Sequence, residues 1–181
     1  MGATHFSGPV VSANGFEGAA ITAAHSAGLV GTEATPVTTR RIESGVIITQ
    51  FSIDLTGLAA SATGDDVIGL AAGGIAYFGQ NVVADNGVIF AMELICLEAP
   101  TGGDTDINVV ANASGTLVYD GAGGTTFGIN GGVQAAGQTV ANTVQGLTAN
   151  HYFYLTGGST ATGTYTAGQF IVTMYGHPLL T

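Results

Sequence analysis

The sequence of 181 residues contains no lysine and only two arginines, against 12 aspartates and glutamates, so its formal net charge is -10. Nucleic-acid binding needs a basic surface that displaces counterions from phosphates, and two arginines cannot supply one. The same deficit argues against docking on an anionic membrane. Without lysine, Walker-type phosphate loops are excluded as well. We therefore expect no nucleic acid and no membrane among the partners.

Cysteine and tryptophan are scarce as well. Cys96 is the single cysteine, and tryptophan is absent. One cysteine forms no intrachain disulfide, so the fold must be held by packing, within the chain or against other subunits. Because Cys96 lies in an apolar run, we interpret it as a small buried hydrophobe rather than a reactive thiol. Any aromatic platform for a sugar would have to come from tyrosine or phenylalanine.

Charged residues make up only 8% of the chain, and prolines number 4 beside 30 glycines. A hydrophobic share of 46% is far from the polar composition of disordered proteins. Too little proline is present for collagen, and too little charge for the e and g positions of a coiled coil. The length is typical of one domain with a real core.

Short apolar segments separated by glycine-rich turns dominate the sequence after residue 44. Residues 45–55 alternate between apolar and polar side chains, which predicts a half-buried strand. The turn signal Asp85-Asn86-Gly87 predicts a hairpin before the next long strand. Further strands are expected at 88–98, 107–111, 116–119, 125–129, 139–144, 151–156 and 165–175. This spacing predicts an all-β fold, a sandwich or a barrel.

The first 43 residues are rich in glycine, alanine, serine and threonine and show no sustained period. We expect an extended N-terminal arm over residues 1–43 and a β-sandwich domain over residues 44–181. From composition alone, a flexible terminus is the alternative to an extended arm.

The segment 88–98 is apolar on both faces of a strand, which is typical of a central position or of a subunit interface. Glu93 interrupts it, on the face of Ala91 and Ile95. A buried carboxylate there would need a partner or a raised pKa. We interpret Glu93 as a residue near an edge or a local kink rather than as a functional acid.

Motifs that carry chemistry are missing. The four histidines have no metal-ligand spacing, and no nucleophile elbow is present. Residues 104–108 begin like a calcium loop, but Val109 and Gly115 replace the glycine and glutamate that an EF-hand needs. Two interpretations of these acids stay open. One is a solvated acidic turn. The other is a calcium site of a different type, whose ligands would be Asp65, Asp66, Asp104 and Asp106. We predict no enzyme, no catalytic residue, no metal and no cofactor.

Residues 4–16 and 165–176 resemble the two ends of small virion structural proteins of tailed bacteriophages. The resemblance implies a capsid decoration (cement) protein, or a related head or fibre component. Members of that class are usually β-sandwich or jelly-roll trimers on the capsid exterior, without catalytic residues. The fold expected is therefore a jelly-roll-like antiparallel β-sandwich with an extended N-terminal arm.

Arg40 and Arg41 carry the only formal positive charge, at the junction of the arm and the first strand. We expect them to pair with Glu43 or with other acids, and one functional interpretation is an anchor onto an acidic partner surface. Together with Phe6 and Phe16 they are the candidate contacts with the capsid or with neighbouring subunits.

The leading hypothesis is a structural virion protein that decorates and stabilises a phage capsid from its exterior as a homotrimer. Its partners would be the major capsid protein and further copies of itself, with the arm binding the capsid lattice. Alternatives are a carbohydrate-binding β-sandwich module, assisted by calcium through Asp104 and Asp106, and a head-fibre or tail component. A hydrolase would rest only on Glu93 and scattered acids.

Overall fold

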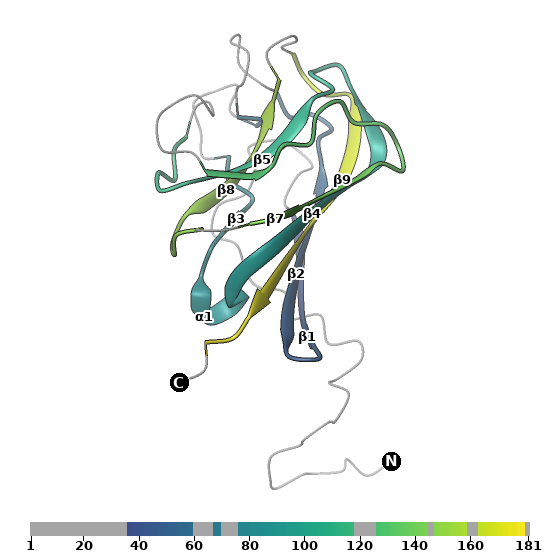
Figure 1. The fold of residues 1–181 in the computed structure, drawn as a ribbon. Coiled ribbons are helices and arrows are strands. Elements are labelled where there is room, and N and C mark those ends of the chain that lie inside the picture. Colours follow the sequence, from purple (N-terminus) through teal and green to yellow (C-terminus); the bar gives the residue numbers. More distant parts are fainter. Residues whose placement is uncertain are drawn as a thin grey trace, which may run out of the picture.

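A computed structural model describes residues 36–59, 67–69, 76–117, 126–144, 147–158 and 163–179. Two antiparallel β-sheets pack face to face (Figure 1), with strand orders β1-β2-β9-β4-β7 and β3-β8-β5-β6. The elements are β1 (Val37–Glu43), β2 (Val46–Asp54), β3 (Gly79–Gln80), α1 (Val83–Asn86), β4 (Val88–Thr101), β5 (Ile107–Asn112), β6 (Thr126–Ile129), β7 (Thr139–Thr143), β8 (Tyr152–Gly157) and β9 (Ala167–His177). The expected all-β sandwich is confirmed.

The strands from β2 to β9 form four nested antiparallel pairs: β2 with β9, β3 with β8, β4 with β7, and β5 with β6. This is the pairing of one long hairpin whose two arms run side by side. Two further pairs, β4 with β9 and β5 with β8, fold the long hairpin over on itself. The folding places β9, the last strand, between β2 and β4, and β1 extends the same sheet at its outer end.

The core lies between the two sheets because every second residue of each long strand points inward. Phe51, Leu94 and Val172 come from three neighbouring strands of one sheet and are each at most 1% exposed. Phe78 and Phe153 meet them from the other side, and the Phe51 and Phe78 ring centroids lie 5.2 Å apart, edge to face. Burying each such side chain stabilises the fold by about 1.5–3 kcal/mol.

The hairpin expected at Asp85-Asn86-Gly87 is wrong. Those residues belong to the one-turn helix α1 and its C-cap, where Gly87 has φ 68°. The segment joins β3 in one sheet to β4 in the other, so the flanking strands do not pair. A turn signal reports local backbone geometry but not which strands it connects. Among the described residues, no helix is long and apolar enough to cross a membrane.

The sheet begins earlier than the domain boundary expected at residue 43. Val37–Glu43 pair in register with β2 along their whole length, so seven residues assigned to the arm belong to the sandwich. Ser44 and Gly45, with φ 51° and 82°, form the two-residue turn between β1 and β2. Both angles are positive, as a type I′ hairpin turn requires.

The strand expected at 116–119 is not seen at Thr116 and Leu117, which lie in a turn and in irregular backbone, and residues 118 and 119 lie outside the described residues. The other expected strands match β2 and β4 to β9 to within a few residues at each end.

Candidate interaction surface

The face of the five-stranded sheet that points away from the core is built from the strands β1, β2, β9, β4 and β7. We call it the outer face. Its rows follow from the strand register, because residues directly opposite one another share a face. The rows are Arg41, Ile48, Tyr175, Ala91 and Thr143; then Thr39, Gln50, Thr173, Glu93 and Ala141; then Ser52, Ile171, Ile95 and Thr139.

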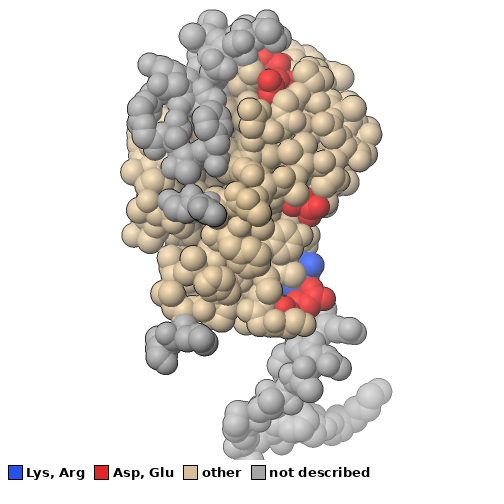
Figure 2. Space-filling view, in the orientation of Figure 1, with Lys and Arg blue, Asp and Glu red and all other residues tan. Residues whose placement is uncertain are grey.

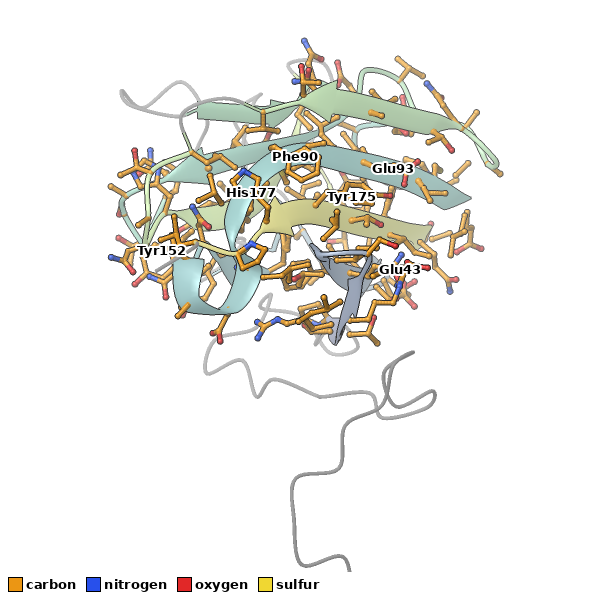
Figure 3. All side chains as sticks on the ribbon, turned by 60° about the horizontal axis from the view of Figure 1, so that its bottom comes forward. Glu43, Phe90, Glu93, Tyr152, Tyr175 and His177 are labelled. Atoms are coloured by element: carbon orange, nitrogen blue, oxygen red, sulfur yellow. The ribbon has the colours of Figure 1, made fainter. Side chains whose placement is uncertain are left out.

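Glu93 and Tyr175 occupy the centre of the outer face and point toward one another from β4 and β9 (Figure 3). The Tyr175 hydroxyl donates to Glu93 Oε2 at 3.1 Å. Burial, the hydrogen bond to Glu93 and the charge of that carboxylate raise the pKa of Tyr175, against a smaller opposite effect of Arg41. Tyr175 is therefore the hydrogen-bond partner that a buried carboxylate at Glu93 requires. The edge or kink expected there is wrong, since β4 lies between β9 and β7 and its register is regular at Glu93.

Replacing Tyr175 with phenylalanine should lower the free energy of unfolding by about 1 kcal/mol, because a hydrogen bond to a carboxylate is lost while the ring stays in place. Urea denaturation followed by circular dichroism measures the change. Tyr152→Phe is the matched control, because the Tyr152 hydroxyl makes no hydrogen bond within the described residues. We expect its free energy of unfolding to change by less than about 0.5 kcal/mol. Equal losses in the two variants would contradict the role of the Glu93 contact.

The two arginines point to opposite faces of β1 and do different things. Arg40 Nη1 lies 3.2 Å from Asp85 Oδ1, and Arg40 Nη2 donates to Asn86 Oδ1 at 3.4 Å. Arg41 lies on the outer face, where its Nη1 donates to Gln50 Oε1 at 2.9 Å and its Nε stands 3.5 Å from Glu43. The expected pairing with Glu43 and another acid is confirmed. Arg40 fastens β1 to α1, whereas Arg41, half exposed, is available to a partner.

Asn86 is a structural residue that the sequence did not reveal. It is 4% exposed. Its Oδ1 accepts hydrogen bonds from Arg40 and from the hydroxyl of Thr49, and its Nδ2 donates to Gln80 O at 2.9 Å. It thereby joins β1, β2 and the approach to α1 at one end of the sandwich. The only signal in the sequence was the turn-forming pair Asn86-Gly87, which says nothing of these contacts.

Apolar side chains flank the polar centre of the outer face. A β-bulge in β4 places Phe90 beside Ala91 opposite the single residue Tyr175, and such bulges redirect a side chain. The Phe90 ring is 41% exposed and stacks on the imidazole of His177, with centroids 5.9 Å apart (Figure 3). A second irregularity holds Leu97, which is 53% exposed. The central position expected for β4 is confirmed and its inner face is buried, whereas its outer face presents these apolar residues to solvent.

Formal charge is sparse over the surface drawn in Figure 2, where uncharged side chains predominate and the arginine atoms lie next to carboxylates. On the outer face itself, Glu93 is engaged by Tyr175, and Glu98 Oε2 accepts the backbone N–H of Gly168 at 3.2 Å. Burying the β9 and β4 part of this face against a partner would therefore leave few unpaired charges, whereas the exposed pair of Arg41 and Glu43 lies on β1 at the end of the sheet.

The turn at residues 104–106, which begins like a calcium loop, uses the carboxylate of Asp104 for a hydrogen bond within the turn itself. Asp104, 2% exposed, accepts the backbone N–H of Asp106 at 2.9 Å, and its carbonyl oxygen accepts the Tyr165 hydroxyl at 3.0 Å. Asp65 and Asp66, the other candidate calcium ligands, lie outside the described residues, as do Phe6 and Phe16. Within the described ranges, no three histidine, cysteine, aspartate or glutamate side chains gather as a metal site would require.

Cys96 is completely buried and its Sγ lies 3.3 Å from the carbonyl oxygen of Glu98. Burial and the nearby Glu98 carboxylate raise the pKa of the Cys96 thiol. The interpretation as a small buried hydrophobe is confirmed.

Three tyrosines gather at the other sheet, a cluster that the sequence does not reveal because Tyr77 lies far in the chain from Tyr152 and Tyr154. Tyr77 and Tyr152 have ring centroids 4.6 Å apart and are both partly exposed. Tyr154 lies edge-on to Tyr77 and is fully buried, with its hydroxyl donating to Ser114 O at 2.6 Å.

Burial raises the pKa of Tyr154 to about 12 from an ordinary value of 10, with smaller effects from its neighbours. The unfolded chain therefore loses this proton first as the pH rises. The stabilising contribution of Tyr154 is complete below pH 10 and is lost as the pH climbs toward 12. We expect chemical denaturation to show a falling free energy of unfolding over this window. The Tyr154→Phe variant should lose part of that slope, and an unchanged slope would contradict the assignment.

No family model, no curated protein and no solved structure matches this chain.

Proposed function

We propose that this protein is a structural component of a bacteriophage virion that decorates and stabilises the capsid from outside as a homotrimer. The observation that carries the proposal is the outer face. This face is formed by five strands, and the side chains of Phe90 and Leu97 are exposed on it. Its central carboxylate, that of Glu93, accepts a hydrogen bond from Tyr175. A surface that is apolar and poor in free charge is suited to being covered by another protein. We assign it to the contact between copies.

The strand order supports the jelly-roll part of the expectation. In a jelly roll, eight strands form two four-stranded sheets that wrap as two Greek keys. The nested pairs from β2 to β9 give two four-stranded sets, β2-β9-β4-β7 and β3-β8-β5-β6, which fit that description, with β1 added outside. Viral capsid proteins and lectins are both built on this architecture, so the fold alone does not choose between them.

Two measurements on the purified protein test the proposal. Sedimentation equilibrium should give a mass three times the 17.9 kDa of the chain. Capsids of a tailed phage, stripped of their own decoration protein, should bind the trimer at a fixed ratio and resist heat or chelator better afterwards. A monomer that does not co-sediment with such capsids would overturn the proposal.

A carbohydrate-binding module is the second candidate, and the partly exposed pair Tyr77 and Tyr152 is the observation that favours it. Sugars stack on aromatic rings in binding sites, and this chain has no tryptophan to offer. Calorimetry against a glycan panel, with and without calcium, separates the candidates. Heat of binding that disappears in Tyr152→Ala would support the sugar site, and no signal with any glycan would remove it.

A further inference from the structure

The outer edge of β1 is the longest regular sheet edge among the described residues. Within the part of the chain that the structure describes, β1 stands at the end of its sheet, pairs only with β2, and keeps one register over seven residues. The other sheet ends are shorter: β7 has five residues, β6 four and β3 two. At β7 the side chain of Asn142 also donates to Gly128 O of β6 at 3.1 Å, so that edge turns toward the second sheet.

The hairpin turn decides which backbone groups of β1 point outward. With Ser44 and Gly45 as a two-residue turn, Glu43 and Val46 form the closing hydrogen-bonded pair. Hydrogen-bonded and non-hydrogen-bonded pairs alternate along an antiparallel ladder. The N–H and C=O groups of Arg40 and Ile42 therefore point away from β2, along the edge.

Proteins protect such edges with lysine, proline, bulges or inward-pointing charges. The chain has no lysine, and β1 contains no proline and no bulge. Arg40 does point inward, but Asp85 neutralises it. Ile42 adds a side chain that is 71% exposed. The edge has the features of an acceptor for another strand.

We propose that the outer edge of β1 pairs with a strand supplied by residues 1–35 of a neighbouring copy. The inference rests on the homo-oligomer of the proposed function and names how its copies are joined. Charge selects the occupant: residues 1–35 contain Glu17 and Glu33 but no arginine or lysine, whereas β1 carries both arginines of the chain. The half-exposed Arg41 can therefore orient the incoming segment, a role in which charge pairs act on specificity more than on affinity.

Length permits the exchange. Thirty-five extended residues reach about 115 Å, and seven of them cover β1 in about 23 Å. Most of the segment then remains for the capsid contact. A neighbouring copy is the donor because an exchange in which each copy gives one segment and accepts one closes a ring, as a trimer requires.

Hydrogen exchange on the full-length trimer tests the pairing directly. The amides of Arg40 and Ile42 should exchange at least about 100-fold more slowly in the trimer than in dissociated chains. Ile42→Pro removes the outward N–H and should weaken association at least tenfold, whereas the control Ile42→Thr keeps the N–H, loses only an exposed side chain and should stay within threefold. A trimer in which these amides exchange freely would overturn the inference and leave the proposed function standing.

A photo-crosslinking amino acid at position 42 identifies the donor, with trimers reassembled from ¹⁵N-labelled and unlabelled chains. Mass spectrometry should find cross-links between position 42 of one chain and residues 1–35 of the other isotope. Cross-links confined to one chain, or absent from residues 1–35, would overturn the exchange. A protein that stays monomeric at all concentrations would end both this inference and the proposed trimer, while capsid binding would still be measured separately.

Discussion

Replacing Gly176 with alanine should lower the free energy of unfolding by about 3 kcal/mol, the upper end of the range for overpacking in a close-packed region. A Cβ at this position of β9 would run into the backbone carbonyl oxygen of Asn86 and lie 3.1 Å from its carbonyl carbon. Neither side can give way easily, because Asn86 is fixed by Gln80, Thr49 and Arg40. In thermal unfolding the loss corresponds to a melting temperature about 10 °C lower.

The control for Gly176→Ala is Gly132→Asn, at a glycine with φ 62° and nothing within 4 Å of an added Cβ. Asparagine tolerates this backbone region, so the change should stay below about 1 kcal/mol. A Gly176→Ala variant as stable as the control would show that α1 and β9 can separate at no cost.

Short apolar segments separated by glycine-rich turns were enough to predict most of the sandwich. β2 was predicted because its inward residues, such as Phe51, repeat with a period of two, and they are buried. β4 was predicted from an apolar run that covers both faces of a strand, and β9 from its place after a glycine-rich turn. β1 was assigned to the arm because its inward positions hold the polar residues Thr38 and Arg40 and so show no apolar period. The partner of Arg40, Asp85, lies far away in the chain. Local pattern cannot reveal such a strand.

The candidate site was harder to predict than the fold, for the same reason. Arg40 and Arg41 are neighbours in sequence and were treated as one cationic anchor, but adjacent residues of a strand point to opposite faces. Once β1 is known to be a strand, one arginine must face α1 and the other the outer face. The contact between Glu93 and Tyr175 spans 82 residues and depends on β9 lying next to β4, which no turn signal in the sequence encodes.

Placing a carboxylate on the outer face should weaken self-association at least 100-fold, or about 2.7 kcal/mol. We choose Leu97→Glu and Phe90→Glu, because both side chains are large, apolar and exposed on this face. In a chain with a net charge of -10, a new carboxylate buried on β4 has no cation beside it to pair with, since Arg41, the arginine of this face, lies on β1 with β2 and β9 in between. An uncompensated charge inside an interface costs several kcal/mol.

Val133→Glu is the matched control for this last prediction. Val133 is 68% exposed, more than either target, but it lies in the connection between β6 and β7 and bridges to Asp106, away from the outer face. All three variants add the same charge, so any general effect of a net charge of -11 appears in the control as well. Sedimentation velocity over a concentration series gives the three association constants, and thermal unfolding checks that each variant is folded. Because only the position of the carboxylate differs, equal weakening by all three would mean that the outer face is not the subunit contact, whereas loss confined to the two face variants locates that contact on β4.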